Sequence, residues 1–348
     1  MPRRLRAVLS AAALLASAMA WAEVDYKIVT ASERGTYIQV GRDLARFVAP
    51  QADISLEVLP SAGSAENVRR LRFEPGVKFA MVQSDVYQAF LDQAAAGNAE
   101  AGNLIRPLRV IMPLYNEEIY FVVRADSPLN YVHEINGARI NVGPLGSGTA
   151  LSTTTLYRLM FNEPTADAKT SFMSNEDALV SLIRDDNLDV VAIVAGQPAK
   201  LLVDMKPESR QYIKLLKFDP QHRASQAALK TYFPATIRSS SYPNLLTEDL
   251  PGLAVKAYLV TYDYNLKNTQ AHLASFARAL CQNFVSLQAN GHPKWREVDL
   301  SLPALGRGWL YFPATAKQLR NCSIGKTSGP PAHSKTCSQH ERILGLCD

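Results

Sequence analysis

The sequence predicts a two-lobed α/β protein in which each lobe is a mostly parallel sheet flanked by helices, with hinge strands between the lobes. Strand-like runs alternate with helical stretches along most of the chain, the pattern of a parallel sheet covered by helices. Two glycine-containing turns, far apart in the chain, each join a strand-like run to a helix. The chain has 348 residues, of which 47% are apolar, and such a length usually divides into about two domains.

The first turn, Thr30–Tyr37, follows the strand-like run Tyr26–Thr30 and opens a helix. The residues of that helix that form its apolar stripe are Val40, Leu44, Phe47 and Val48. Glycine lets the backbone approach a ligand closely, and the first amides of a helix have no intrahelical acceptor. The turn is therefore suited to hold an anion such as a carboxylate.

Two further strand–helix units follow in the first lobe. The run Ile54–Leu59 leads through Pro60–Ser64 into a helix, and Phe79–Val82 leads through Gln83–Asp85 into another. Ligands of open parallel sheets bind at the carboxyl ends of the strands. This places three polar residues among the candidates for ligand contact, each of which has a plain alternative as a helix cap or surface residue: Ser64, Gln83 and Ser84.

The second glycine-rich turn, Gly143–Thr149, lies between Arg139–Val142 and the helical stretch Ala150–Phe161. Backbone amides and the hydroxyls of Ser147 and Thr149 could hold an anion there without a metal. The alternative is a tight connection with a Ser or Thr cap. Later, the continuous apolar run Val190–Val194 predicts a strand buried on both faces, and it ends in Ala195–Gly196.

Two β-rich runs predict the crossings between lobes. Leu108–Leu114 and Ile119–Val123 are separated by Tyr115–Glu118, and the second run is expected to enter the other lobe, with Ala254–Thr261 as the return. Residues 23–117 and 240–321 then form one lobe and 118–239 the other, so the lobes can hinge about two connections.

The N-terminal segment, residues 1–22, predicts a cleaved secretory signal. It has three arginines, then an apolar run, and small residues at its end. The alternative is an uncleaved membrane anchor. The formal charge of +5 includes those three arginines, and 5 − 3 leaves +2 after cleavage, so no nucleic-acid partner is expected.

The four cysteines lie at positions 281, 322, 337 and 347. They permit three complete pairings, among which the sequence cannot choose. Cys281 shares the stripe of a helix predicted at about 269–289, which favours a buried free thiol. Cys337, His340 and Cys347 could instead hold a metal, but their spacing fits no common site, and no metal is expected. Residues 322–348 are expected to form a Cys-containing C-terminal tail.

No pairing of nucleophile and base can be named from the sequence, and no cofactor is expected. Gly325-Lys326-Thr327 lacks the first glycine of a P-loop, because position 320 is Arg. His133-Glu134 lacks the second His of a zinc protease helix. The chain is therefore expected to bind a ligand and not to act as an enzyme.

Several short motifs, in order, resemble the TAXI-type solute receptors of TRAP transporters from about Val24 to about Arg320. They are Gly35-Thr36-Tyr37, Gly63-Ser64-x-Glu66-Asn67, Val82-Gln83-Ser84-Asp85, Val142-Gly143-x-x-Gly146-Ser147-Gly148-Thr149, Val194-Ala195-Gly196 and Pro234-Ala235-Thr236-Ile237. The resemblance implies an exported, monomeric receptor with the two-lobed periplasmic binding protein fold. Such a receptor closes on a small solute and delivers it to a membrane permease.

The resemblance also implies which residues contact the solute. The family's binding loops correspond here to Gly35, Thr36, Tyr37, Ser64, Gln83, Ser84, Ser147, Gly148, Thr149, Val194, Ala195 and Gly196. Tyr37 is expected to cover the solute. The first loop departs from the family pattern of Thr-Gly-Gly, and Arg34 and Arg238 stand at unusual places. Each arginine could pair with a second carboxylate of the solute or lie in solvent.

The expected function is capture of a small organic acid or amino acid, similar to glutamate, in the periplasm, and its delivery to a TRAP permease. Two alternatives remain at this point. The same fold could dock on a membrane sensor instead of a permease, or the cleft could have been recruited by a periplasmic enzyme.

Overall fold

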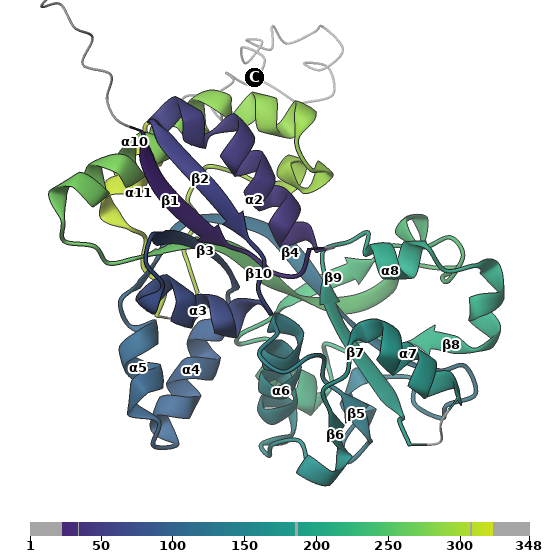
Figure 1. The fold of residues 1–348 in the computed structure, drawn as a ribbon. Coiled ribbons are helices and arrows are strands. Elements are labelled where there is room, and N and C mark those ends of the chain that lie inside the picture. The colour runs from purple at the N-terminus through teal and green to yellow at the C-terminus, as the bar shows by residue number, and fades with distance from the viewer. Residues whose placement is uncertain (1–22, 34, 185–186, 307, 323–348) are drawn as a thin grey trace, which may run out of the picture.

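The computed structural model describes residues 23–33, 35–184, 187–306 and 308–322, and its ten strands pair into one continuous sheet. The strand order is β2-β1-β3-β10-β4-β7-β5-β6, while β8 pairs with β4 and β9 pairs with β10. The two halves of this sheet form two lobes, each with helices packed on both faces (Figure 1). The predicted signal segment lies outside the described residues.

Lobe I contains the parallel half β2-β1-β3. Side chains alternate along β3, so that Phe79 and Met81 pack with α2 and α10, while Ala80 and Val82 pack with α3, α4 and α5. The lobe is built from β1 (Val24–Val29), α2 (Thr36–Phe47), β2 (Ile54–Leu59), α3 (Ser64–Phe73), β3 (Val77–Gln83), α4 (Val86–Ala95), α5 (Ala99–Ile105), α10 (Lys267–Asn290) and α11 (Pro313–Arg320).

Two long strands, β4 (Leu108–Arg124) and β10 (Leu250–Tyr262), belong to both lobes. They pair antiparallel from Leu253 opposite Ile119 to Tyr262 opposite Leu108. The prediction that Tyr115–Glu118 separates two strands was wrong, because Asn116 and Glu117 pair with Lys256 and Val255 in an unbroken strand. The strand predicted at 254–261 is confirmed as part of β10.

Lobe II contains the parallel half β7-β5-β6. Buried side chains again alternate: Phe121 and Ala192 face α6 and α9, whereas Tyr120 and Val191 face α7 and α8. The lobe is built from β5 (Ile140–Asn141), α6 (Gly148–Phe161), β6 (Thr170–Ser171), α7 (Asn175–Arg184), β7 (Val190–Ala195), α8 (Lys200–Val203), β8 (Ile213–Leu215), α9 (Arg223–Ala228) and β9 (Phe233–Ile237). None of the helices in the described part of the chain is long and apolar enough to cross a membrane.

Cys281 and Cys322 form a disulfide, with Cα atoms 5.7 Å apart. The expectation of a free thiol at Cys281 was therefore wrong. Its position on the inner stripe of α10 is the reason, because that stripe packs against the end of α11 and brings Cys322 within reach. Cys322, the first residue of the predicted tail, thus belongs to the core of lobe I. Cys337, His340 and Cys347 lie outside the described residues.

Replacing both Cys281 and Cys322 by Ala should lower the free energy of unfolding by about 2–4 kcal/mol, because the bond closes a long loop in the unfolded chain. Denaturant unfolding of the oxidised protein measures this loss. The matched control replaces Cys337 and Cys347 instead and should unfold near the wild-type midpoint. Equal midpoints for wild type and the Cys281/Cys322 variant would contradict the assignment.

Candidate functional site

The starts of α3 in lobe I and α6 in lobe II lie against each other at the junction of the lobes (Figure 1). A Cβ atom added to Gly63, the residue before α3, would lie 2.9 Å from the amide nitrogen of Gly148, and Gly63 has φ +130°. Only glycine allows both this backbone conformation and this approach. The lack of a side chain at Gly63 therefore lets two helix N-termini, with their outward-pointing amides, meet at one place.

Gln83, the last residue of β3, lies between these helix starts. A Cβ atom at Gly148 would come within 2.2 Å of its Oε1 atom, so the carboxamide packs directly on the first residue of α6. Ser64 of α3 donates to Oε1 at 3.3 Å, and Ser152 of α6 donates to it at 3.4 Å. Hydroxyl donors from both lobes thus converge on one oxygen atom.

The remaining polar candidates on these loops already have backbone partners. The Ser147 hydroxyl accepts from the amide of Ala150 at 3.0 Å and caps α6. The Thr149 hydroxyl accepts from the amide of Val194 at 3.4 Å and ties α6 to β7. The Ser84 hydroxyl accepts from the amide of Lys256 at 3.3 Å. These three side chains fix the positions of the loops, and among them Ser147 caps a helix, which is the alternative that the sequence offered for it.

Tyr37 of α2 is buried and donates a hydrogen bond of 2.9 Å to Oε2 of Glu117. Its ring contacts that of Tyr115 edge to face, with centroids 6.4 Å apart. Burial raises the pKa of Glu117 to about 7, although hydrogen bonds from Tyr37 and Gln83 act in the opposite direction. Glu117 therefore lies between the start of α2 and the group of donors around Gln83.

Glu118, the next residue of β4, has a different environment. Its Oε2 atom accepts from the amide of Gln197 at 2.7 Å, and Gln197 in turn accepts from the amide of Arg238 at 2.7 Å. Burial raises the pKa of Glu118, and Lys294 partly opposes that effect. Gly196 leaves space for Lys294, whose Cε atom would lie 2.8 Å from a Cβ atom there.

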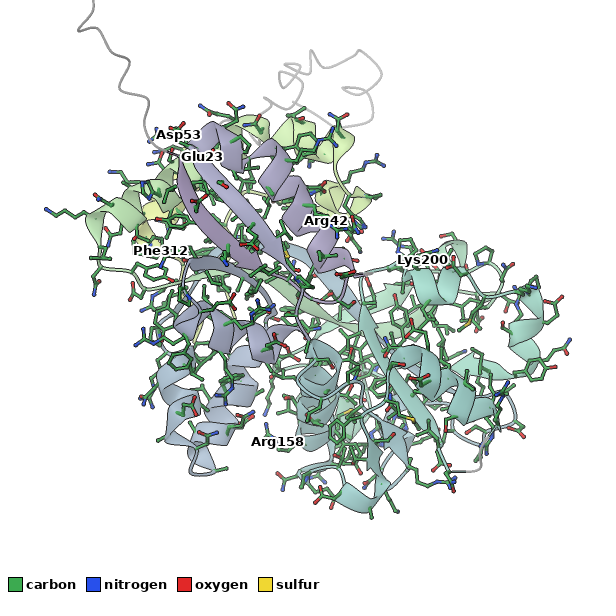
Figure 2. The ribbon with its side chains drawn as sticks, in the orientation of Figure 1. Glu23, Arg42, Asp53, Arg158, Lys200 and Phe312 are labelled. Atoms are coloured by element: carbon green, nitrogen blue, oxygen red, sulfur yellow. A yellow bond between two sulfur atoms is a disulfide. The ribbon has the colours of Figure 1, made fainter. Side chains whose placement is uncertain are left out.

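Two polar contacts join the lobes beside α6. The Tyr232 hydroxyl of lobe II lies 2.8 Å from Oδ2 of Asp85 and 2.9 Å from the carbonyl oxygen of Ser152, and its one proton is shared between these two acceptors. Arg158 of α6, labelled in Figure 2, pairs with Asp92 of α4. Burial raises the pKa of Asp85 to about 6. Hydrogen bonds from Tyr232 and from the Ser152 hydroxyl, whose one proton is shared with Gln83, offset only part of the desolvation.

Apart from Ser84, Ser147 and Thr149, whose partners are given above, the predicted candidates divide into three groups. Tyr37, Ser64, Gln83 and Gly148 belong to one connected region, which runs through Glu117, and Gly196 lies beside Tyr115 at its edge. Arg238 is exposed, and Arg34 lies outside the described residues. Four further candidates lie on elements next to this region. Gly35 and Thr36 are at the start of α2, and Val194 and Ala195 are on β7, where Ala195 pairs with Glu118.

Sequence analysis missed several residues of this region. Glu117 and Glu118 did give a signal, because two adjacent acids interrupt an otherwise apolar run that pairs on both sides. Lys294 gave none, since it lies far along the chain, in the segment Pro293–Glu297 that follows α10. Within the described part of the chain, no group of three His, Cys, Asp or Glu residues could hold a metal ion.

Comparisons with known proteins find one matching family and several similar solved structures. A model of the NMT1-like family matches residues 28–300. One similar solved structure is a Candida albicans gene product with the generic periplasmic binding protein structural fold, at 13% identity over 88% of this chain and 92% of that chain, with a TM-score of 0.44. A TctC solute binding protein from Polaromonas is 15% identical over 86% and 90% of the two chains, with a TM-score of 0.39. A binding protein component of an ABC phosphonate transporter from Pseudomonas aeruginosa is 14% identical over 93% of each chain, with a TM-score of 0.44.

Gly63→Ala should disturb the junction, whereas Gly97→Ala should not. Both glycines have positive φ, at +130° and +102°, so both variants carry backbone strain. Only Gly63 faces another backbone, because nothing lies within 4 Å of the Cβ position at Gly97. Denaturant unfolding should show Gly63→Ala less stable than Gly97→Ala by at least about 1 kcal/mol. Equal losses would mean that α3 and α6 do not meet as described.

Asp85→Asn should stabilise the protein at neutral pH. A buried carboxyl with a raised pKa binds its proton more tightly in the folded state, so stability falls as pH rises from about 4 to about 6. Asn can still accept from Tyr232 but has no charge to bury. The variant should therefore gain about 2–3 kcal/mol above about pH 6 and nothing near pH 4. Thermal or denaturant unfolding across this range measures the difference, and parallel curves for both proteins would contradict it.

Proposed function

This chain belongs to the NMT1-like family and has the periplasmic binding protein fold, and on that premise we propose that it is the solute receptor of a TRAP-type transporter, of the TAXI kind. It works in the periplasm, captures a small carboxylate or amino acid between its lobes, and passes it to the membrane permease. The observation that supports this function best is the meeting of the α3 and α6 starts around Gln83, with donors from both lobes.

A solute carboxylate suits this place for electrostatic reasons. The first amides of α3 and α6 have no intrahelical acceptor, and the dipoles of both helices favour negative charge there. The Ser64 and Ser152 hydroxyls already donate to the Gln83 oxygen, and a carboxylate oxygen that displaced it would accept from the same two groups. Binding then needs neither a metal nor an activated nucleophile.

Capture proceeds by closure of the lobes about β4 and β10. A solute held by α3 and α6 together binds the closed arrangement better than the open one and shifts the population toward it. The Asp85–Tyr232 hydrogen bond and the Asp92–Arg158 ion pair form between the lobes beside this site. Both contacts must break on opening, so they favour the closed arrangement and help to retain the solute.

Isothermal titration of ligand-stripped protein with glutamate, glutamine, 2-oxoglutarate and C4-dicarboxylates tests the proposal. At least one of them should bind, and small-angle scattering should show a smaller radius of gyration at saturation. The double variant Ser64→Ala/Ser152→Ala should bind that solute about 10- to 100-fold more weakly, because two donors to a charged group are lost. Thr154→Ala is the control, since the Thr154 hydroxyl donates within α6 to the Ala150 carbonyl. Absence of binding to every solute would overturn the proposal.

A further inference from the structure

A short strap, residues 292–297, leads from the end of α10 to the junction of the lobes. It contains the 3₁₀ helix Pro293–Glu297. Its Lys294 is only 4% exposed and packs against lobe II, because a Cβ atom at Gly196 would lie 2.8 Å from the Lys294 Cε atom. The position of the strap therefore affects the place where the two lobes meet.

Asp43 of α2 holds the strap in lobe I. Its Oδ2 atom accepts from the backbone amide of His292 at 2.7 Å and from the indole Nε1 of Trp295 at 2.9 Å. A Cβ atom at Gly291 would lie 2.8 Å from the same oxygen, so the chain passes directly over the carboxylate. One carboxylate oxygen thus fixes the chain at two points of the strap.

The imidazole of His292 completes the first turn of the strap. Its Nδ1 atom accepts from the backbone amide of Lys294 at 3.2 Å and caps the helix Pro293–Glu297. An imidazole nitrogen accepts a hydrogen bond only while it carries no proton, so this cap belongs to the neutral side chain. Protonation would place an N–H group opposite the N–H group of Lys294. The cap would then be lost.

The charged groups that act on His292 are Asp43 from α2 and Lys294 and Glu297 from the strap, while Arg296 is directed toward the end of α10. Burial lowers the pKa of His292; Asp43 and Glu297 oppose this effect, and Lys294 adds to it. The ordinary pKa of imidazole is about 6.5. Because the pKa in the folded strap is lower, the ordered strap is favoured above about pH 6.5 and is lost as the pH falls through that lower value.

Two contacts carry the position of the strap into lobe II. The first is the packing of Lys294 on Gly196. The second runs through Glu118, whose carboxylate accepts from the Gln197 amide at 2.7 Å. Burial raises the pKa of Glu118 and Lys294 opposes that effect, so Lys294 helps to keep this carboxylate charged. Withdrawal of Lys294 would weaken both contacts.

We propose that His292 is a pH-sensitive switch: its protonation in acid releases the strap, withdraws Lys294 from Gly196, and loosens the turn of lobe II at Gln197. Solute is then retained less well in acid than at neutral pH. This consequence rests on the proposed receptor function, whereas release of the strap does not. The effector is the proton itself.

Hydrogen exchange of the Lys294 and Gln197 amides tests the switch without any solute. His292→Asn keeps a capping acceptor but cannot titrate. Wild type and this variant should exchange alike at about pH 8, whereas wild type should exchange up to about tenfold faster at about pH 5, since one unit of pKa is a factor of ten. Both proteins are compared at the same pH. The pH dependence of exchange chemistry and the titration of Asp85 and Glu117 therefore cancel.

The matched control is His222→Asn. His222 caps α9 in the same way, because its Nδ1 atom accepts from the Ala224 amide at 3.2 Å, but it lies outside the strap. This variant should exchange like wild type at Lys294 and Gln197 at both pH values. An equal effect of the two His variants would contradict a switch located at His292.

Asp43→Asn is a second, independent variant, and it serves as the test if His292→Asn fails to fold. Asn can accept the same two hydrogen bonds but lacks the negative charge that favours protonated His292. The acid transition in Lys294 exchange should therefore move to lower pH. A purely structural role of Asp43 would instead speed exchange at every pH.

Calorimetry at about pH 5 with glutamate, glutamine, 2-oxoglutarate and C4-dicarboxylates adds the effect on the solute: any that binds should bind wild type up to about tenfold more weakly than His292→Asn. Equal exchange of the two proteins at that pH would overturn the switch. Faster exchange at Lys294 without faster exchange at Gln197, or equal affinities, would overturn its coupling to lobe II. Absence of binding by every compound would overturn the receptor function alone, because the exchange measurements use no solute.

Discussion

The antiparallel pairing of β4 with β10 holds the two lobes together and places the site. These strands are long enough to pair with β3 in one lobe and with β7 and β9 in the other, so both parallel halves of the sheet depend on them. The middle of β4 necessarily lies where the lobes meet. Glu117 and Glu118 occupy that middle, where pairing with Val255 and Ala254 fixes their backbone. The backbone thereby fixes two costly charges at the junction.

Glycine determines how closely the helices approach this strand pair. At Gly63 and Gly148 the absence of side chains brings two helix starts together, and the positive ends of their dipoles lie near the buried acids. The junction thus combines donors and acceptors within one small region.

Local pattern was enough to predict most of the fold. The apolar runs Val190–Val194 and Ala254–Thr261 lie within β7 and β10, and the helix predicted at about 269–289 lies within α10. Errors arose where a distant partner decides the structure. Tyr115–Glu118 is polar enough to suggest a break, but pairing with β10 keeps it extended. Cys281 has the spacing of a core residue, and only the packing of α11 on α10 shows that Cys322 is its partner.

The candidate site was predictable on its glycine and hydroxyl side and not on its charged side. A strand–glycine–helix turn can be recognised from a few consecutive residues, so Ser64, Gln83 and Gly148 could all be named from the sequence. Tyr37 was found too, but as a cover for the solute, whereas its hydroxyl is bonded to an acid far along the chain. Lys294 and Tyr232 reach the junction only through the tertiary fold, which leaves no local mark in the sequence.

The Cys281–Cys322 bond connects α10 to the residue that follows the end of α11. Both belong to lobe I, and the bond does not involve β4 or β10. The disulfide therefore stabilises lobe I and does not restrain the angle between the two lobes. Under the proposed closure of the lobes, disulfide formation and that motion are independent: reduction should make the protein easier to unfold and leave the motion unchanged.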